Sequence, residues 1–282
     1  MGVLDRIVAH KREELATRRR QAPPADMRRR AADAPPARPF HAALRDPGAP
    51  PGVNAGASGV RLIAEVKGAS PSAGTIRAGF DPAAIARTYA AAGAAAVSVL
   101  TDARFFSGTD EHLRRVRAAV DVPVLRKDFT LDSYHVYEAR AIGADAVLLI
   151  AAILDRNAVA DLAALAGDLG MAALIEAHTE PELTMALAGR PTGAAQPWLV
   201  GINNRNLDTL ETSLDVTRRL RPLVPREVTV VSESGFDSRQ DVEELERLGV
   251  HAVLIGTALM RSADPGARIR DFFGAPAPSQ GD

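Results

Sequence analysis

The chain has 282 residues, of which 34 are Lys or Arg and 35 are Asp or Glu, and its formal net charge is −1. This balance argues against a nucleic acid or an anionic membrane surface as a partner held mainly by charge. Cysteine is absent, which excludes disulfides, thiolate metal sites and cysteine nucleophiles. Any catalysis would therefore use oxygen and nitrogen groups.

The sequence predicts neither a membrane span nor a secretory signal. Its longest apolar run, residues 146–154, is well short of the ~18 residues that a membrane helix requires. Asp5, Arg6 and His10 lie where a signal peptide would need an apolar core. We therefore expect a cytoplasmic protein. The six histidines have no metal-ligand spacing, so no metal site is predicted.

The N-terminal region predicts a helical extension. Leu4, Ile7 and Leu15 recur at near-helical spacing among charged residues, which indicates an amphipathic helix over about 4–20. We interpret the arginines at 18–20 and 28–30 as solvated helix surface, and we expect the prolines between 23 and 39 to break regular structure. The predicted organisation is an extension over 1–45 that covers the barrel mouth, a linker over 46–59, a barrel over 60–273 and a frayed tail over 274–282.

Eight short apolar runs alternate with helical patterns along the rest of the chain. The runs cover residues 61–67, 95–100, 122–127, 145–150, 171–177, 197–203, 228–234 and 251–256. Gly93, Gly143, Gly170 and Gly249 stand where a left-handed residue usually ends a helix. Strands separated by helices pair in parallel. Eight such units favour an α/β fold, a (β/α)8 TIM barrel with an extra N-terminal helix, over an open doubly wound sheet.

Polar residues end several of the predicted strands, where barrels of this type place their active sites. The period of two in 61–67 puts Glu65 and Lys67 on the face of Ile63, which would point both charges into the mouth. Because a buried ion pair often stabilises a protein less than apolar packing does, the pair favours a functional role. Five more polar residues end other strands: Lys127, Glu176, Asn203, Arg205 and Glu233. Such a group predicts proton-transfer chemistry but does not identify a substrate.

The last two predicted strands run into Ser234-Gly235 and Gly256-Thr257. Glycine lets backbone amides approach a ligand, and the corresponding loops of these barrels often bind phosphate. A phosphate site is therefore predicted, with tight turns as the alternative. Phe106 and Phe129 lie beside the second and third strand ends, which suggests a flat apolar ligand, although ordinary packing is also consistent with them.

Seven ordered motifs at these strand ends resemble the indole-3-glycerol phosphate synthase family. They are IAEVKGASPS at 63–72, SVLTDARFFSGT at 98–109, LRKDF at 125–129, LIEA at 174–177, GINNRNL at 201–207, VSESGF at 231–236 and LIGTALM at 254–260. The resemblance implies ring closure, decarboxylation and dehydration of 1-(2-carboxyphenylamino)-1-deoxyribulose 5-phosphate in tryptophan biosynthesis. It implies no cofactor.

The resemblance also implies roles for the charged residues. Lys127 matches the general acid that protonates the substrate ketone, and Glu176 matches the general base that completes dehydration. Lys67 matches a second lysine, which lies at the substrate carboxylate and can donate the proton that expels water. Glu65 and Glu233 match acidic residues that hold the two lysines charged and in place.

The remaining matched positions would hold the substrate. Asn203 and Arg205 match residues that position the substrate and Glu176. Other substrate-binding positions are Ser70, Pro71, Ser72, Phe106, Phe129, Leu207 and Ser234, and the phosphate-binding positions are Ser234, Gly235, Gly256 and Thr257. Gly68 and Ala73 stand where basic residues are common in the family, so the first loop carries less positive charge than usual.

Two other readings of the same residues stay open at this point. One is a Schiff-base aldolase in which Lys127 is the nucleophile, and the other is a phosphate-ligand binder without catalysis. The presence of Lys67, Lys127 and Glu176 together speaks against the binder, since binding alone needs no acid and base. We expect a small-molecule substrate, no nucleic acid or membrane partner, and a monomer or weak homodimer.

Overall fold

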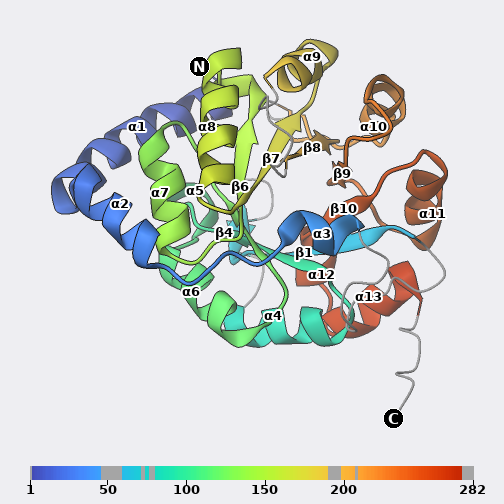
Figure 1. The fold of residues 1–282 in the computed structure, drawn as a ribbon. Helices are drawn as coiled ribbons and strands as arrows, with labels where there is room; N and C mark the ends of the chain where they lie inside the picture. Colours follow the sequence, from blue (N-terminus) through green and yellow to red (C-terminus); the bar gives the residue numbers. More distant parts are fainter. Residues whose placement is uncertain are drawn as a thin grey trace.

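The computed structural model describes residues 2–45, 59–70, 74–75, 80–189, 198–206 and 209–274. Eight parallel strands close into a barrel in the order β1-β10-β9-β8-β7-β6-β5-β4 (Figure 1). They are β1 (Arg61–Val66), β4 (Ala96–Leu100), β5 (Val124–Lys127), β6 (Ala146–Ile150), β7 (Ala172–Ala177), β8 (Trp198–Asn203), β9 (Val230–Glu233) and β10 (Ala252–Ile255). Each lies within one predicted run, and the predicted barrel is confirmed. A short antiparallel pair, β2 (Ala69–Ser70) and β3 (Gly74–Thr75), was not predicted.

Helices surround the barrel and connect its strands (Figure 1). They are α4 (Pro82–Ala91), α5 (Ala103–Phe106), α6 (Asp110–Ala119), α7 (Ser133–Ala141), α8 (Arg156–Asp168), α9 (Glu180–Ala188), α10 (Asp215–Leu220), α11 (Arg239–Arg247), α12 (Thr257–Met260) and α13 (Pro265–Phe273), with short 3-10 turns η1 (Ala151–Ile153) and η2 (Arg221–Leu223). Polar caps begin many of them; the Asp155 carboxylate, for example, accepts from the Ala158 amide at 2.8 Å. The four predicted left-handed glycines have φ between 77° and 100°, as expected.

The strands alternate between two apolar environments. Ile63 packs inside the barrel with Leu125 and Leu174, whereas Leu62 and Val66 pack outward beneath the helices. This alternation confirms the predicted faces of the first strand. It also fixes which side chains can reach the mouth, since every second residue of a strand points to the same side.

Three helices precede the barrel: α1 (Val3–Gln21), α2 (Pro24–Asp33) and α3 (Phe40–Arg45). The prediction that the prolines break regular structure was wrong at Pro24, which begins α2. The first helical turn tolerates proline because its amide needs no partner. Helix α2 packs against α7 (Figure 1). Helix α3 lies at the end of the barrel opposite the mouth, where Phe40 joins the interior cluster and His41 Nε2 lies 2.9 Å from Thr229 Oγ1. The extension therefore does not cover the mouth as one unit.

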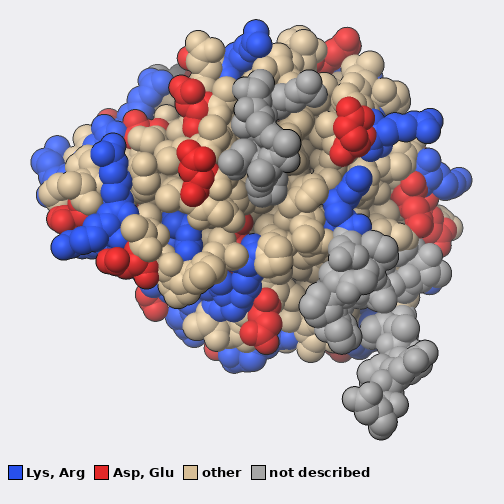
Figure 2. Space-filling view, in the orientation of Figure 1, with Lys and Arg blue, Asp and Glu red and all other residues tan. Residues whose placement is uncertain are grey.

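Charged side chains of both signs are interspersed on the face drawn in Figure 2, and basic ones gather over α1 and α2. Arg18 corrects the interpretation of these arginines as solvated surface. Its guanidinium lies 2.8 Å from Asp110 and 2.7 Å from Glu138, and its side chain is 21% exposed. Within the described ranges, no helix is long and apolar enough to cross a membrane, and no cluster of three or more His, Asp or Glu could hold a metal ion.

Candidate active site

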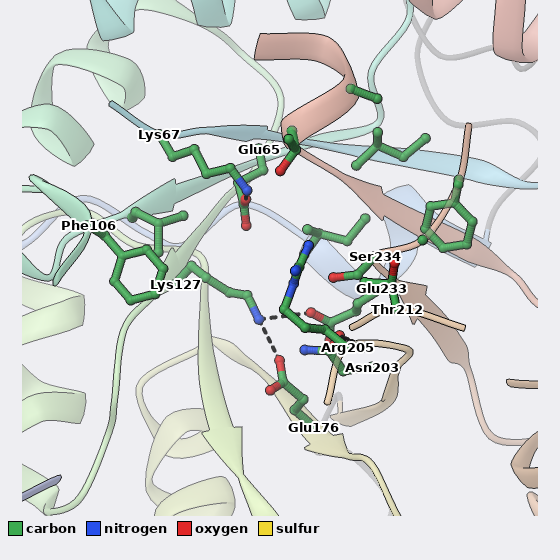
Figure 3. A pocket seen from close by; sticks show the side chains of 18 of the residues that line it. Glu65, Lys67, Phe106, Lys127, Glu176, Asn203, Arg205, Thr212, Glu233 and Ser234 are labelled. Atoms are coloured by element: carbon green, nitrogen blue, oxygen red, sulfur yellow. Dashed lines mark hydrogen bonds and ion pairs between the residues drawn. The ribbon is translucent and has the colours of Figure 1, made fainter. Parts of the chain in front are cut away.

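A pocket of about 430 Å³ lies at the C-terminal ends of the barrel strands (Figure 3). This volume suits a small organic ligand. The predicted site residues that line it are Glu65, Lys67, Phe106, Lys127, Phe129, Glu176, Asn203, Arg205, Glu233, Ser234, Gly235, Gly256 and Thr257. Pro71, Ser72, Leu207 and the side chain of Ser70 lie outside what the structure describes.

The charged residues reach the pocket because of the strand period. Glu65, Lys127, Glu176 and Glu233 follow interior apolar residues of the same strands by two positions, namely Ile63, Leu125, Leu174 and Val231. Residues two apart on a strand share a face. The same alternation that builds the apolar interior therefore directs these four charges into the mouth.

Lys127 lies between two carboxyl groups (Figure 3). Its Nζ is 2.5 Å from Glu176 Oε2 and 2.8 Å from Glu233 Oε2. Burial by itself would lower the pKa of Lys127, but Glu176, Glu233 and, at longer range, Glu65 raise it above its ordinary value. Lys127 is therefore a protonated amine at neutral pH, as a general acid requires.

The pKa values of the two carboxyl groups around Lys127 shift in opposite directions. Burial tends to raise both pKa values, but Lys127 and His178 lower the pKa of Glu176 to about 2. Burial and the negative charge of Glu176 raise the pKa of Glu233 to about 8, against the opposing effect of Lys127. The structure thus pushes the pKa values of the two carboxyl groups apart, a division typical of acid and base pairs.

A second ion pair lies across the pocket. Lys67 Nζ is 2.7 Å from Glu65 Oε1 (Figure 3). A Cβ atom on Gly256 would lie 2.3 Å from that same Glu65 oxygen, and one on Gly201 would lie 2.4 Å from Glu233 Oε1. Glycine at these two positions leaves room for the carboxyl groups. The sequence reasoning missed Gly201, and it assigned Gly256 to phosphate binding alone.

Two aromatic rings form one side of the pocket. Phe106 ends α5 and Phe129 follows β5, and their ring centroids lie 6.2 Å apart at an interplanar angle of 37°. The structure therefore brings together two side chains that are separated in the sequence. Their tilted arrangement leaves an apolar surface that suits a flat ring.

Glu176 has a neighbour that the sequence reasoning overlooked. Its Oε1 lies 3.4 Å from His178 Nε2, and His178 Nδ1 lies 3.1 Å from Glu182. Burial would lower the pKa of His178, but Glu182 and Glu176 raise it above the ordinary value. The period of two could have identified His178, because it follows Glu176 by two residues.

Among the described residues, Asn203 and Arg205 make no hydrogen bond or ion pair with Glu176. The Asn203 side-chain oxygen accepts from the Arg205 backbone amide at 3.0 Å, and Arg205 Nη1 donates to the Leu210 carbonyl at 2.7 Å. Both side chains line the pocket. Their predicted role in positioning Glu176 stays a prediction.

The loop after β9 has an unusual backbone. Ser234 and Gly235 both have positive φ, at 67° and 85°, and the Asn204 side-chain amide donates to the Ser234 carbonyl at 3.0 Å. Positive φ is uncommon outside glycine and often marks functional sites. Arg261 and Arg268 line the same end of the pocket. The sequence reasoning missed these two arginines, which add positive charge near the predicted phosphate loops.

The sequence matches known proteins over nearly its whole length. The family described as indole-3-glycerol phosphate synthase matches residues 4–272. An indole-3-glycerol phosphate synthase from Roseiflexus castenholzii is 48% identical over 280 residues, which cover 96% of this chain and 98% of that protein.

Two solved structures share the fold at low sequence identity. The 3-hexulose-6-phosphate synthase from Salmonella typhimurium is 12% identical with a TM-score of 0.59, covering 76% of this chain and 96% of that one. The thiamine phosphate pyrophosphorylase from Pyrococcus furiosus is 14% identical with a TM-score of 0.54, covering 76% and 94%. At this low identity, the two structures show only that the fold is shared. The family match, in contrast, spans nearly the whole chain. The chain belongs to the indole-3-glycerol phosphate synthase family.

Proposed function

We propose that this pocket converts 1-(2-carboxyphenylamino)-1-deoxyribulose 5-phosphate to indole-3-glycerol phosphate, with the residue roles given below. The reaction closes a five-membered ring and releases CO2 and water, as expected of a carboxy-lyase. The position of Lys127 between Glu176 and Glu233, at the mouth of a barrel of this family, is the observation that carries the proposal.

Lys127 acts first, as the general acid. The aromatic carbon that bears the carboxylate is a weak nucleophile, so its attack on the ketone needs a proton donor at the ketone oxygen. The neighbouring carboxyl groups keep Lys127 protonated until the substrate arrives. Transfer of its proton to the ketone oxygen leaves a hydroxyl group on the new ring.

Lys67 and Glu176 act in the later steps. Loss of CO2 restores the aromatic ring, and Lys67 extends into the same pocket as Lys127, where it can face the substrate carboxylate (Figure 3). Dehydration then needs one proton on the leaving hydroxyl and the removal of one from the adjacent carbon. We assign the donor role to Lys67 and the base role to Glu176, whose low pKa keeps it ionised.

The two ends of the substrate fit the two ends of the pocket. The anthranilate ring fits beside Phe106 and Phe129, which offer an apolar surface. The phosphate fits the loops at Ser234-Gly235 and Gly256-Thr257, where backbone amides and nearby arginines favour an anion. This orientation places the reacting atoms between the two lysines.

A fluorescence assay tests the proposal. Purified protein is mixed with the substrate in the absence of metal and cofactor, and the appearance of indole fluorescence is followed. We expect product to form. A protein that binds the substrate without forming product would support the non-catalytic reading. Borohydride trapping of Lys127 with a keto-sugar phosphate would support the aldolase reading.

We also propose that the enzyme acts in the cytoplasm as a monomer or weak homodimer. The absence of cysteine is compatible with a reducing compartment. The residues assigned to the reaction, Lys67, Lys127 and Glu176, all line one pocket within a single chain. Light scattering coupled to size-exclusion chromatography measures the oligomeric state, and activity that persists in the monomer fraction supports the proposal.

A further inference from the structure

Helix α1 places one lysine in the protein interior at the edge of the mouth. Lys11 is 2% exposed. Its Nζ lies 2.8 Å from Asp128 Oδ1, 3.2 Å from Asp102 Oδ2 and 2.9 Å from Glu14 Oε2. Lys11 does not line the described pocket, and no step of the proposed reaction uses it.

The two aspartates belong to the segments that carry the aromatic rings of the pocket. Asp102 caps α5, where its carboxylate accepts from the Phe105 amide at 2.7 Å, and α5 ends at Phe106. Asp128 follows Lys127 directly, and its carboxylate accepts from the Phe129 amide at 2.8 Å. One ammonium group thus connects the ends of β4 and β5.

In the cluster around Lys11, the ammonium group and the carboxyl groups favour one another's charged forms. Burial would lower the pKa of Lys11, but Asp128 and Asp102 raise it above the ordinary value. Burial would raise the pKa of Asp128, but Lys11 and Arg126 hold it below the ordinary range. Removal of Lys11 would leave buried carboxylates without their main partner, and the loops that carry them would have to move to gain solvent or protons.

We infer that Lys11 is a positioning residue that fixes the spacing of Phe106 and Phe129 and thereby sets the affinity of the pocket for the aromatic end of the substrate. The identity of that ligand rests on the proposed function. The N-terminal helix acts here through one buried charge rather than by direct contact with the substrate.

Arg18 provides a matched control on the same helix. It anchors α1 to Asp110 of α6 and Glu138 of α7, neither of which carries a pocket ring. Arg18 also contacts Glu14, a partner of Lys11. A variant at Arg18 therefore loosens α1 and removes one partner of Glu14, but it keeps the Lys11 ammonium group between Asp102 and Asp128. Comparison of the two variants separates the specific effect of Lys11 from general loosening of the helix.

The experiment compares Lys11→Met, Arg18→Met and the unaltered protein. Dissociation constants are measured for anthranilate, which represents the aromatic end, and for inorganic phosphate, which represents the other end; kcat and KM follow with the full substrate. For Lys11→Met we expect anthranilate affinity to fall about tenfold and KM to rise similarly, with phosphate affinity changed less than about twofold. For Arg18→Met we expect both affinities to stay within about twofold.

Two outcomes would overturn the inference: unchanged anthranilate affinity in Lys11→Met, or an equal loss in Arg18→Met. If Lys11→Met does not fold, Asp102→Asn serves the same purpose, because it removes one charge of the cluster but keeps an oxygen to cap α5. Selective loss of anthranilate affinity is again expected, and an unchanged affinity contradicts the inference. Failure of the unaltered protein to form indole product would instead count against the proposed function.

Discussion

The barrel interior consists of two layers of opposite character, built by the same strands. In the layer far from the mouth, apolar side chains such as Leu125 and Leu174 fill the space, and Phe40 and Leu44 of α3 close it. Two residues further along these strands stand Lys127 and Glu176. A step of two residues, about 7 Å, thus separates the apolar side chains that fill the barrel from the charged side chains of the pocket.

The comparison teaches that stability and activity depend on different positions of one strand. Burial of the apolar layer removes hydrocarbon from water and stabilises the fold. Burial of the charged layer costs desolvation free energy, which its own ion pairs offset only in part. Substitutions in the two layers should therefore have separable effects.

Removal of Lys127 should have the largest effect on activity. We expect Lys127→Ala to reduce kcat by about 10²- to 10⁴-fold, because the ketone loses its proton donor. Substrate affinity should stay within about tenfold, and thermal stability should also fall, because Glu176 and Glu233 lose their buried partner. Single-turnover fluorescence and calorimetry measure these quantities. An unchanged kcat in the folded variant would remove Lys127 from the acid role.

Glu176→Gln tests the base and should come next in size. The amide keeps the shape of the side chain but cannot accept the proton, so we expect kcat to fall by about 10²- to 10³-fold with a smaller change in KM. Steady-state kinetics measure both constants. An unchanged kcat would remove Glu176 from the base role.

Leu174→Ala tests the apolar layer at the residue two positions before Glu176. Leu174 is completely buried, and the cavity left by its truncation should lower the free energy of unfolding by about 2–5 kcal/mol. Urea denaturation measures this loss. The kcat of the folded variant, measured well below its melting temperature, should stay within a few fold; a loss as large as that of Glu176→Gln would show that the layers are coupled.

The pH dependence of stability should show a smaller effect from Glu233. Its pKa is raised from 4.5 to about 8 on folding, so the folded state binds more protons than the unfolded state between these values. Stability should therefore fall as pH rises through this window, by at most about 1.4 kcal/mol per unit from this group. The raised pKa of His178 acts in the same direction. Urea unfolding of Glu233→Gln between pH 5 and 8 isolates the contribution of Glu233, and an unchanged slope would contradict its raised pKa.

The sequence by itself predicted the barrel and most of the charged layer. Both follow from local periodicity, since the alternation of runs fixes the strands and the period of two fixes which side chains share a face. The period of two identified Glu65 and Lys67, and the position at the end of a predicted strand identified Lys127, Glu176 and Glu233. His178 obeys the same period and could have been named as well.

Only the tertiary structure decided the contacts between distant segments. Lys11 had no predicted role, and Arg18 was interpreted as solvated helix surface. Arg18 nevertheless contacts Asp110 and Glu138, which lie 92 and 120 residues away. No sequence pattern distinguished Gly201 from other strand residues. Its role in leaving room for the Glu233 carboxyl group became visible only when the structure placed Glu233 on the neighbouring strand. Periodicity describes one element at a time, whereas a buried charge or a missing Cβ has meaning only through the groups that folding places beside it.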